Sequence, residues 1–299
     1  MEAPVKREVR AIQVAILSSI IGAVTKFLVG FITGSMSMIS SGVDSLGDLF
    51  VSIANLFVVK LSAREADEDH NYGHAKIEGL GAMFEGGFIF AAGVFIIYEA
   101  IHKIVVGEVS HDSTLGIAVM LPILALTTGT VLYLRKVAKE TGSLVLKADA
   151  LHYTTDVYMN IGVLVALVLV KLTGHPVIDS IISIGLALYM LYSSLRIVGE
   201  GFGIVMDKSL EPDVVKALKA FLSSATKIES FHDFKTRSGR IPHVDFHVIV
   251  RPEMTARELH DLFLELRAGV QALVGPSTKV LMHADPAGEP DEPESGDSV

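Results

Sequence analysis

The sequence predicts six transmembrane helices followed by a smaller α+β domain. The chain has 299 residues, half of them hydrophobic, and its mean hydropathy of +0.49 is high for a soluble protein. Each apolar block is close to the roughly 20 residues that cross a hydrocarbon core of about 30 Å. The blocks lie at 11–32, 36–60, 79–101, 114–134, 144–171 and 177–200. We therefore expect a transmembrane domain over residues 1–205, a cytoplasmic domain over 206–286 and a disordered acidic tail over 287–299.

The distribution of basic residues predicts the orientation, because Lys and Arg favour cytoplasmic loops. Only Lys103 and Lys171 lie on one side of the predicted spans. Ten basic residues lie on the other: Lys6, Arg7, Arg10, Lys60, Arg64, Lys76, Arg135, Lys136, Lys139 and Lys147. We expect a multi-pass protein of the cell (inner or plasma) membrane with both termini in the cytoplasm.

Composition limits the ligands that a metal site could use and the partners that the chain could bind. The chain has no Cys, so a metal site would use imidazole, carboxylate or backbone oxygen ligands. Its net charge is -9 and it contains no basic stripe, which argues against nucleic-acid binding.

The second span carries two acids, Asp44 and Asp48, on one helical face. Ionisable residues at membrane depth are costly and indicate a functional site. Two like charges this close require a cation, a shared proton or both. A plain alternative is that one Asp is protonated or paired with Lys26 of the first span, which would explain only one of the two acids.

The fifth span carries His152 and Asp156 with the same spacing of four. At 1.5 Å per residue, Asp44 and Asp48 lie about 12 and 18 Å from one membrane edge. His152 and Asp156 lie about 12 and 18 Å from the opposite edge. In a core of about 30 Å this places the two pairs at matching depth, where they could form one tetrahedral metal site. A satisfied core histidine is the alternative for His152.

Lys26 and Glu85 are further charged residues deep within the predicted spans. We expect Lys26 to extend toward the membrane surface or to pair with an acid of the third span, for which Glu85 is deep enough.

The loop after the second span contains Asp67, His70 and His74. Their spacing of three and then four brings nitrogen and oxygen donors together on a turn, in a combination that suits Zn²⁺ and similar ions. A solvated charged loop is the alternative.

The cytoplasmic domain is predicted to have the order αββαβ. Helices are expected over 211–224 and from Thr255 to about Leu273, and strands over 229–238, 243–251 and 278–283. Possible metal ligands lie mostly near the ends of these elements, with surface histidines as the alternative: His232, His247, His260, His283 and Asp285. His243 and Asp245 are weaker candidates on the same strand face as His247.

These motifs resemble the cation diffusion facilitator (CDF) family, most closely its bacterial zinc/proton antiporter branch. The resemblance covers about residues 5–286. It implies that Asp44, Asp48, His152 and Asp156 form the transport site. It also implies that Asp67, His70 and His74 form an interfacial site, and that the cytoplasmic candidates form a binuclear one. Ala284 departs from the pattern, since relatives carry a larger polar residue there.

The resemblance further implies a homodimer in lipid, with ferredoxin-like or metallochaperone-like cytoplasmic domains meeting across a two-fold axis. Lys76 and Asp207 match a charge interlock of the family. The implied activity is secondary active efflux of Zn²⁺ in exchange for protons, with Zn²⁺ also bound as a structural or regulatory ion. Fe²⁺, Mn²⁺, Cd²⁺ or Co²⁺ are alternative cargoes.

Two other classes of protein fit the sequence less well. An enzyme is not expected, because neither a metalloprotease H-E-x-x-H pair nor an ATP-binding P-loop is present. A non-transporting metal sensor or scaffold would retain the cytoplasmic ligands but could lose the four in the membrane, and this chain has all four.

Overall fold

The computed structural model of the chain describes residues 3–33, 36–106, 114–173 and 177–288. The chain divides into two compact units, Met1–Val205 and Met206–Val299. Most of the predicted acidic tail, residues 289–299, lies outside the described residues.

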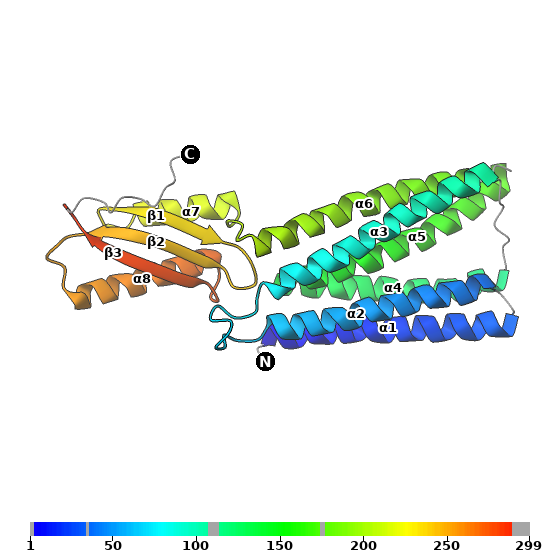
Figure 1. The fold of residues 1–299 in the computed structure, drawn as a ribbon, viewed down its shortest axis with the longest axis horizontal. Helices are drawn as coiled ribbons and strands as arrows, with labels where there is room; N and C mark the ends of the chain where they lie inside the picture. The colour runs from blue at the N-terminus through cyan, green and yellow to red at the C-terminus, as the bar shows by residue number, and fades with distance from the viewer. Residues whose placement is uncertain (1–2, 34–35, 107–113, 174–176, 289–299) are drawn as a thin grey trace. The chain divides into compact units, whose positions relative to one another are not determined.

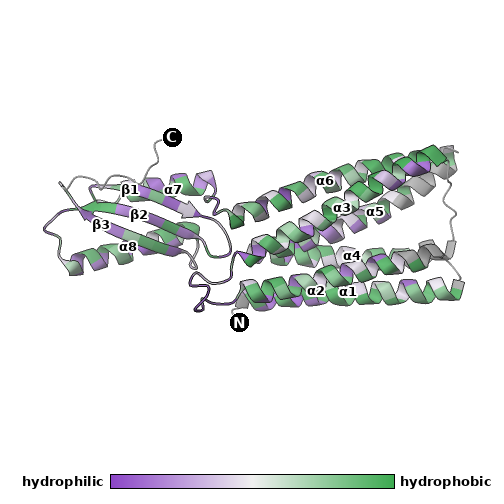
Figure 2. Cartoon of the chain, viewed as in Figure 1, coloured by the Kyte–Doolittle hydropathy of each residue, from purple (hydrophilic) through white to green (hydrophobic). Residues whose placement is uncertain are grey.

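The first unit is built from six long helices (Figure 1). They are α1 (Ala3–Thr33), α2 (Met36–Ser62), α3 (Ile77–Val106), α4 (Thr114–Thr141), α5 (Leu144–Thr173) and α6 (Val177–Val205). Figure 2 shows that hydrophobic residues dominate these helices, whereas the second unit is mixed. Within the described residues, all but α5 contain a stretch long and apolar enough to cross a membrane. The predicted helical membrane domain is therefore confirmed.

Several helices extend beyond the apolar blocks that predict them. Helix α1 begins eight residues before its block, at Ala3, and α4 continues seven residues past its block, to Thr141. The blocks mark only the part of a helix that suits hydrocarbon, whereas the backbone hydrogen bonds continue through polar turns in the interfacial region. Apolar runs therefore locate the spans but not the helix ends.

Close packing within this unit forms two groups of helices that share α5, because Leu144 and Ala148 of α5 also pack against Ala82 of α3 and Ile197 of α6. Helices α1, α2, α4 and α5 share one buried cluster that includes Ile12, Val59, Leu134 and Leu146. Helices α3 and α6 pack along each other, and their backbones approach closely where Gly79 faces Gly201. A Cβ on Gly79 would lie 2.7 Å from the carbonyl oxygen of Gly201. Small residues permit such an approach between membrane helices.

The second unit contains α7 (Pro212–Ser223), β1 (Ser230–Arg237), β2 (His243–Val250), α8 (Ala256–Val274) and β3 (Lys279–Pro286). The order αββαβ confirms the predicted α+β domain. Strand β2 lies between the other two, antiparallel to β1 and parallel to β3. Pro212 begins α7, and a capping box of Thr255 and Glu258 begins α8.

The two helices cover one face of this sheet. Alternate residues of β2 are buried with the apolar faces of α7 and α8: Val244, Phe246, Val248 and Val250. Successive strand residues point to opposite faces, so His243, Asp245 and His247 lie on the face away from the helices. The predicted ligands therefore lie outside the hydrophobic core.

Candidate metal sites

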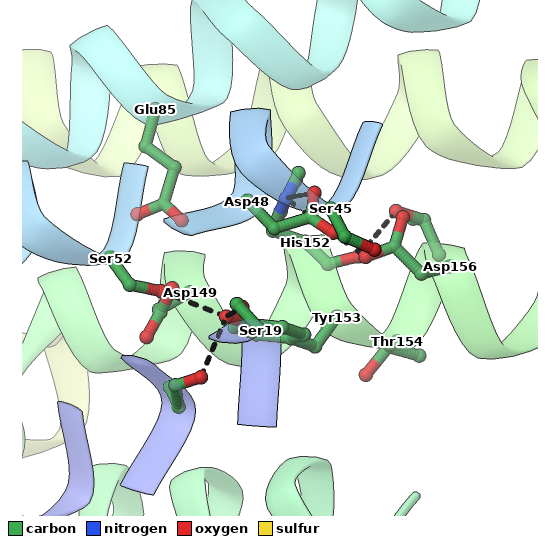
Figure 3. A network of polar contacts seen from close by, with 12 residues as sticks. Ser19, Ser45, Asp48, Ser52, Glu85, Asp149, His152, Tyr153, Thr154 and Asp156 are labelled. Atoms are coloured by element: carbon green, nitrogen blue, oxygen red, sulfur yellow. Dashed lines mark hydrogen bonds and ion pairs between the residues drawn. The ribbon is translucent and has the colours of Figure 1, made fainter. Parts of the chain in front are cut away.

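The first site lies between α2 and α5, inside the six-helix unit. His152 Nε2 is 3.0 Å from Asp48 Oδ1 and 3.9 Å from Asp156 Oδ2. One ligand atom from each of these three residues lies within 4.8 Å of the other two. Figure 3 shows the three side chains converging, Asp48 from α2 and the other two from α5. One imidazole and two carboxylates form a donor set that suits a divalent metal.

The remaining predicted member, Asp44, lines the same cavity but lies outside the group of three. This cavity has a volume of about 530 Å³ and also contains Lys26. Lys26 Nζ donates to Ser45 Oγ at 2.9 Å and to the Ser41 carbonyl at 3.3 Å. The expected pairing of Lys26 with Glu85 is not what the structure shows, because the lysine side chain is held on α2. Lys26 therefore adds a positive charge to the cavity that contains the carboxylates.

Two groups of buried polar side chains lie next to this site and were not predicted from the sequence. The Tyr153 hydroxyl shares hydrogen bonds with Ser19 Oγ (2.6 Å) and Ser52 Oγ (2.9 Å), which ties α5 to α1 and α2 (Figure 3). Asn55 Nδ2 donates to the carboxyls of Glu85 and Asp149. Asn55 lies seven residues after Asp48, and Asp149 lies three residues before His152, so each shares a helix face with a predicted ligand. This spacing was the sequence signal for the second group.

The second site is the loop between α2 and α3. Asp67 accepts a hydrogen bond from the His70 backbone N–H at 2.7 Å, and its other carboxylate oxygen lies 3.4 Å from His74 Nε2. The ligand atoms of Asp67, His70 and His74 lie within 4.8 Å of one another. Gly73 permits this turn with a positive φ of 78°. The His70 backbone hydrogen bond lowers the pKa of Asp67, which keeps this carboxylate ionised and able to bind a cation.

The third site lies on the open face of the sheet. Strand pairing places His232 of β1 opposite His247 of β2, and His247 opposite His283 of β3. Asp285 Oδ2 is 3.4 Å from both His232 Nε2 and His247 Nδ1, and its Oδ1 is 3.2 Å from His283 Nε2. The structure thus brings together four of the five predicted cytoplasmic ligands, with three histidines around the carboxylate of Asp285.

His260 is the fifth predicted ligand, and it is exposed on α8. It does not belong to the group of ligand atoms that lie within 4.8 Å of one another, which comes from His232, His247 and Asp285. His243, a weaker candidate, lies 3.2 Å from the Arg237 guanidinium. Burial, and then the charge of Arg237, lower the pKa of His243. The arrangement at His243 is that of a neutral imidazole beside a cation.

Asp233 is an additional acid at this site that was not predicted from the sequence. Its Oδ2 lies 3.8 Å from His247 Nε2, because a register shift in β1 and a positive φ of 46° turn the residue toward β2. A hydrogen bond from Lys235 lowers the pKa of Asp233. Neither the shift in register nor the backbone conformation is evident from the sequence.

The predicted interlock residues each have a partner within their own unit. Lys76 Nζ donates to the Val205 carbonyl at 3.2 Å, and Asp207 lies 3.5 Å from Arg237 NH1. An interlock between Lys76 and Asp207 stays a prediction.

Comparison with known proteins covers nearly the whole chain. The family model for the cation efflux transmembrane domain matches residues 12–206, and that for the cation efflux protein cytoplasmic domain matches residues 210–287. The cation-efflux pumps FieF of Yersinia pestis (strain Pestoides F) and Yersinia pseudotuberculosis (serotype O:3, strain YPIII) are each 33% identical over 277 residues. The match covers 92% of this chain and 91% of each pump.

A solved structure also matches part of the chain. The zinc form of the chain named CzrB is 30% identical and covers 29% of this chain and 99% of its own, with a TM-score of 0.26. The two family matches together span both units. The chain is a member of the cation diffusion facilitator family and is a cation efflux transporter of that type.

Proposed function

We propose that this transporter exports divalent metal ions, with Zn²⁺ as the main cargo, from the cytoplasm in exchange for protons. The observation that carries the proposal is the group of Asp48, His152 and Asp156 inside the membrane unit. His152 is buried, and all three donors line one cavity that is large enough to hold an ion.

Proton exchange follows from the chemistry of the ligands. A metal ion binds neutral imidazole and ionised carboxylates, so its binding releases protons and protonation releases the metal. Alternating access would expose the site first to the cytoplasm, where it takes up metal, and then to the outside, where protons replace the metal. The basic loops predict this orientation.

Zinc is the favoured cargo because its tetrahedral N/O coordination fits one imidazole and two or three carboxylates, with Asp44 as the additional ligand. Fe²⁺, Mn²⁺, Cd²⁺ and Co²⁺ bind the same donor types, and flux measured for each ion would rank them. The loop and sheet sites would bind zinc as structural or regulatory ions. We further propose a homodimer, supported by the match to the cytoplasmic domain of the family.

The test is zinc flux in proteoliposomes with and without a pH gradient. We expect a proton gradient to drive flux in the wild type, and His152→Ala and Asp48→Ala to abolish it. The matched control is His102→Ala, which removes an exposed imidazole from α3 and should leave the flux unchanged. Normal flux in both site variants would contradict the proposal. Metal binding without flux in the wild type would favour a sensor or scaffold.

A further inference from the structure

A pair of buried carboxyls lies beside the transport site and has no role in the exchange described above. Glu85 of α3 and Asp149 of α5 are both 0% exposed. Asn55 of α2 joins them, because its Nδ2 donates to Glu85 Oε2 at 3.1 Å and to Asp149 Oδ1 at 3.2 Å. In Figure 3 the Glu85 side chain extends from α3 in the direction of Asp149. Three helices thus contribute to one polar centre.

This centre has unused capacity to bind a cation. The second oxygens, Glu85 Oε1 and Asp149 Oδ2, are buried and accept no hydrogen bond from the described residues. A buried acceptor without a partner is costly, and two carboxylates joined by one neutral amide cannot both be ionised without a positive charge. The geometry therefore leaves one unpartnered buried oxygen on each of two carboxyls that the Asn55 amide holds together, and a cation bound to both oxygens would compensate their negative charge.

The centre is displaced from the transport site toward one end of the helices. Asn55 follows Asp48 by seven residues, about 10 Å along α2 in the direction of Ser62. Asp149 precedes His152 by three residues in the direction of Leu144. These two helix ends lead to the loops that the basic residues place in the cytoplasm, and the transport cavity is lined by none of the three centre residues. An ion arriving from the cytoplasm would reach this centre first.

We propose that Glu85, Asp149 and Asn55 form a second cation site in the membrane, which takes the divalent ion before it passes to Asp48, His152 and Asp156. The inference rests on the proposed transport function. Its donors are all oxygen, without the imidazole of the other three sites, so it binds zinc more weakly than they do. Weak binding suits a site that an ion must both enter and leave.

The first experiment measures zinc flux against zinc concentration on the loading side. Glu85→Gln and Asp149→Asn remove one charge each while keeping a similar shape and an acceptor for the Asn55 amide. We expect the half-saturating zinc concentration to rise at least about tenfold, as when a group that supports metal binding is lost. The maximal rate should change less. Glu99→Gln on the same helix is the matched control and should leave both values unchanged.

The second experiment observes the site directly by cadmium NMR of the full chain at saturating cadmium. An all-oxygen site gives a resonance well separated from those of sites that contain imidazole. We expect this resonance in the wild type, its loss in Glu85→Gln and Asp149→Asn, and its retention in Asp48→Ala. Asp48→Ala should nevertheless lose flux, so the second site and the transport site are tested separately.

Two outcomes would overturn the proposal. One is the absence of an all-oxygen cadmium resonance in the wild type. The other is a pair of variants with wild-type half-saturation, even if their thermal stability changes, because the centre would then be only a structural polar contact. If the wild type showed no flux at all, the proposed function would fail, whereas the cadmium spectrum would still decide whether the site exists.

Discussion

The proposed transport site and the sheet site both combine histidine with aspartate, but in different proportions and surroundings. Between α2 and α5, one imidazole meets two carboxylates, and the His152 side chain is 9% exposed. On the sheet, three imidazoles surround the carboxylate of Asp285, and the side chains of His232 and His247 are 30% and 37% exposed. The membrane site therefore has more carboxylates than imidazoles around a buried histidine, whereas the sheet site has more imidazoles than carboxylates around a half-buried aspartate.

The two sites also differ in what holds their ligands in place. Backbone hydrogen bonds between strands fix the histidines of the sheet, so opening that site would break the sheet ladder. Asp48 and His152 belong to separate helices that meet only through side chains, so α2 and α5 can move apart while each keeps its own hydrogen bonds. The sheet is therefore suited to retain a metal and the helix pair to release one.

The largest expected effect is a loss of zinc flux when the site between α2 and α5 is changed, but not when the sheet site is changed. Asp48→Asn should lower zinc flux in proteoliposomes by at least about a hundredfold, the upper end of the losses seen when a group that supports metal binding is removed. Asp285→Asn should leave the maximal flux close to the wild-type value, because the proposed path of the transported ion runs through Asp48, His152 and Asp156. Equal losses in both variants would break the comparison.

Thermal unfolding tests whether the sheet site retains metal. Zinc at a hundred times its dissociation constant should stabilise the folded wild type by about 2.7 kcal/mol. His247→Ala should lose most of this zinc-dependent increase in the melting temperature. His260→Ala should lose little, because His260 lies outside the close group of ligands. A full loss in His260→Ala would make this histidine a ligand.

Helix packing in the membrane unit can be tested with a pair of glycines on α3. In Gly79→Ala the new Cβ would lie 2.7 Å from the Gly201 carbonyl oxygen, so we expect a loss of about 1–3 kcal/mol in the free energy of unfolding. Gly87→Ala is the control, since a Cβ there meets nothing within 4 Å among the described residues. The measurement is thermal unfolding in detergent. Equal stability of the two variants would contradict the close helix crossing.

The smallest effect concerns the cap of α8, which supports the sheet. Thr255→Ala should cost about 1 kcal/mol of stability. Hydrogen bonds from the Thr255 backbone N–H and hydroxyl hold the pKa of Glu258 below its ordinary value. A depressed pKa stabilises the fold above the ordinary glutamate pKa, and this contribution disappears as the pH falls through the depressed value. Glu258→Gln should therefore flatten the acid side of the stability curve measured by thermal unfolding.

The sequence predicts the membrane helices and the order of the sheet elements because hydropathy and periodicity are local properties. It also indicates Asp48 and His152 as candidates, since charges at membrane depth are conspicuous and their depths match. Contacts among buried polar groups depend on which helix faces meet, and for this reason Lys26 bonds to α2 rather than to Glu85, and Asn55 and Asp149 were not predicted. Strand register likewise depends on pairing between segments that are distant in the sequence. The alignment of His232, His247 and His283 therefore becomes evident only in the structure.

That alignment limits which insertions and deletions the second unit can accept. Adding or removing a residue in the segments between strands need not change the pairing. A single insertion within β2 or β3 would turn the histidine that follows it from the open face of the sheet to the helix-covered face. The metal ligands on the sheet should therefore persist among relatives that differ in loop length, and should be lost together where a strand gains or loses one residue.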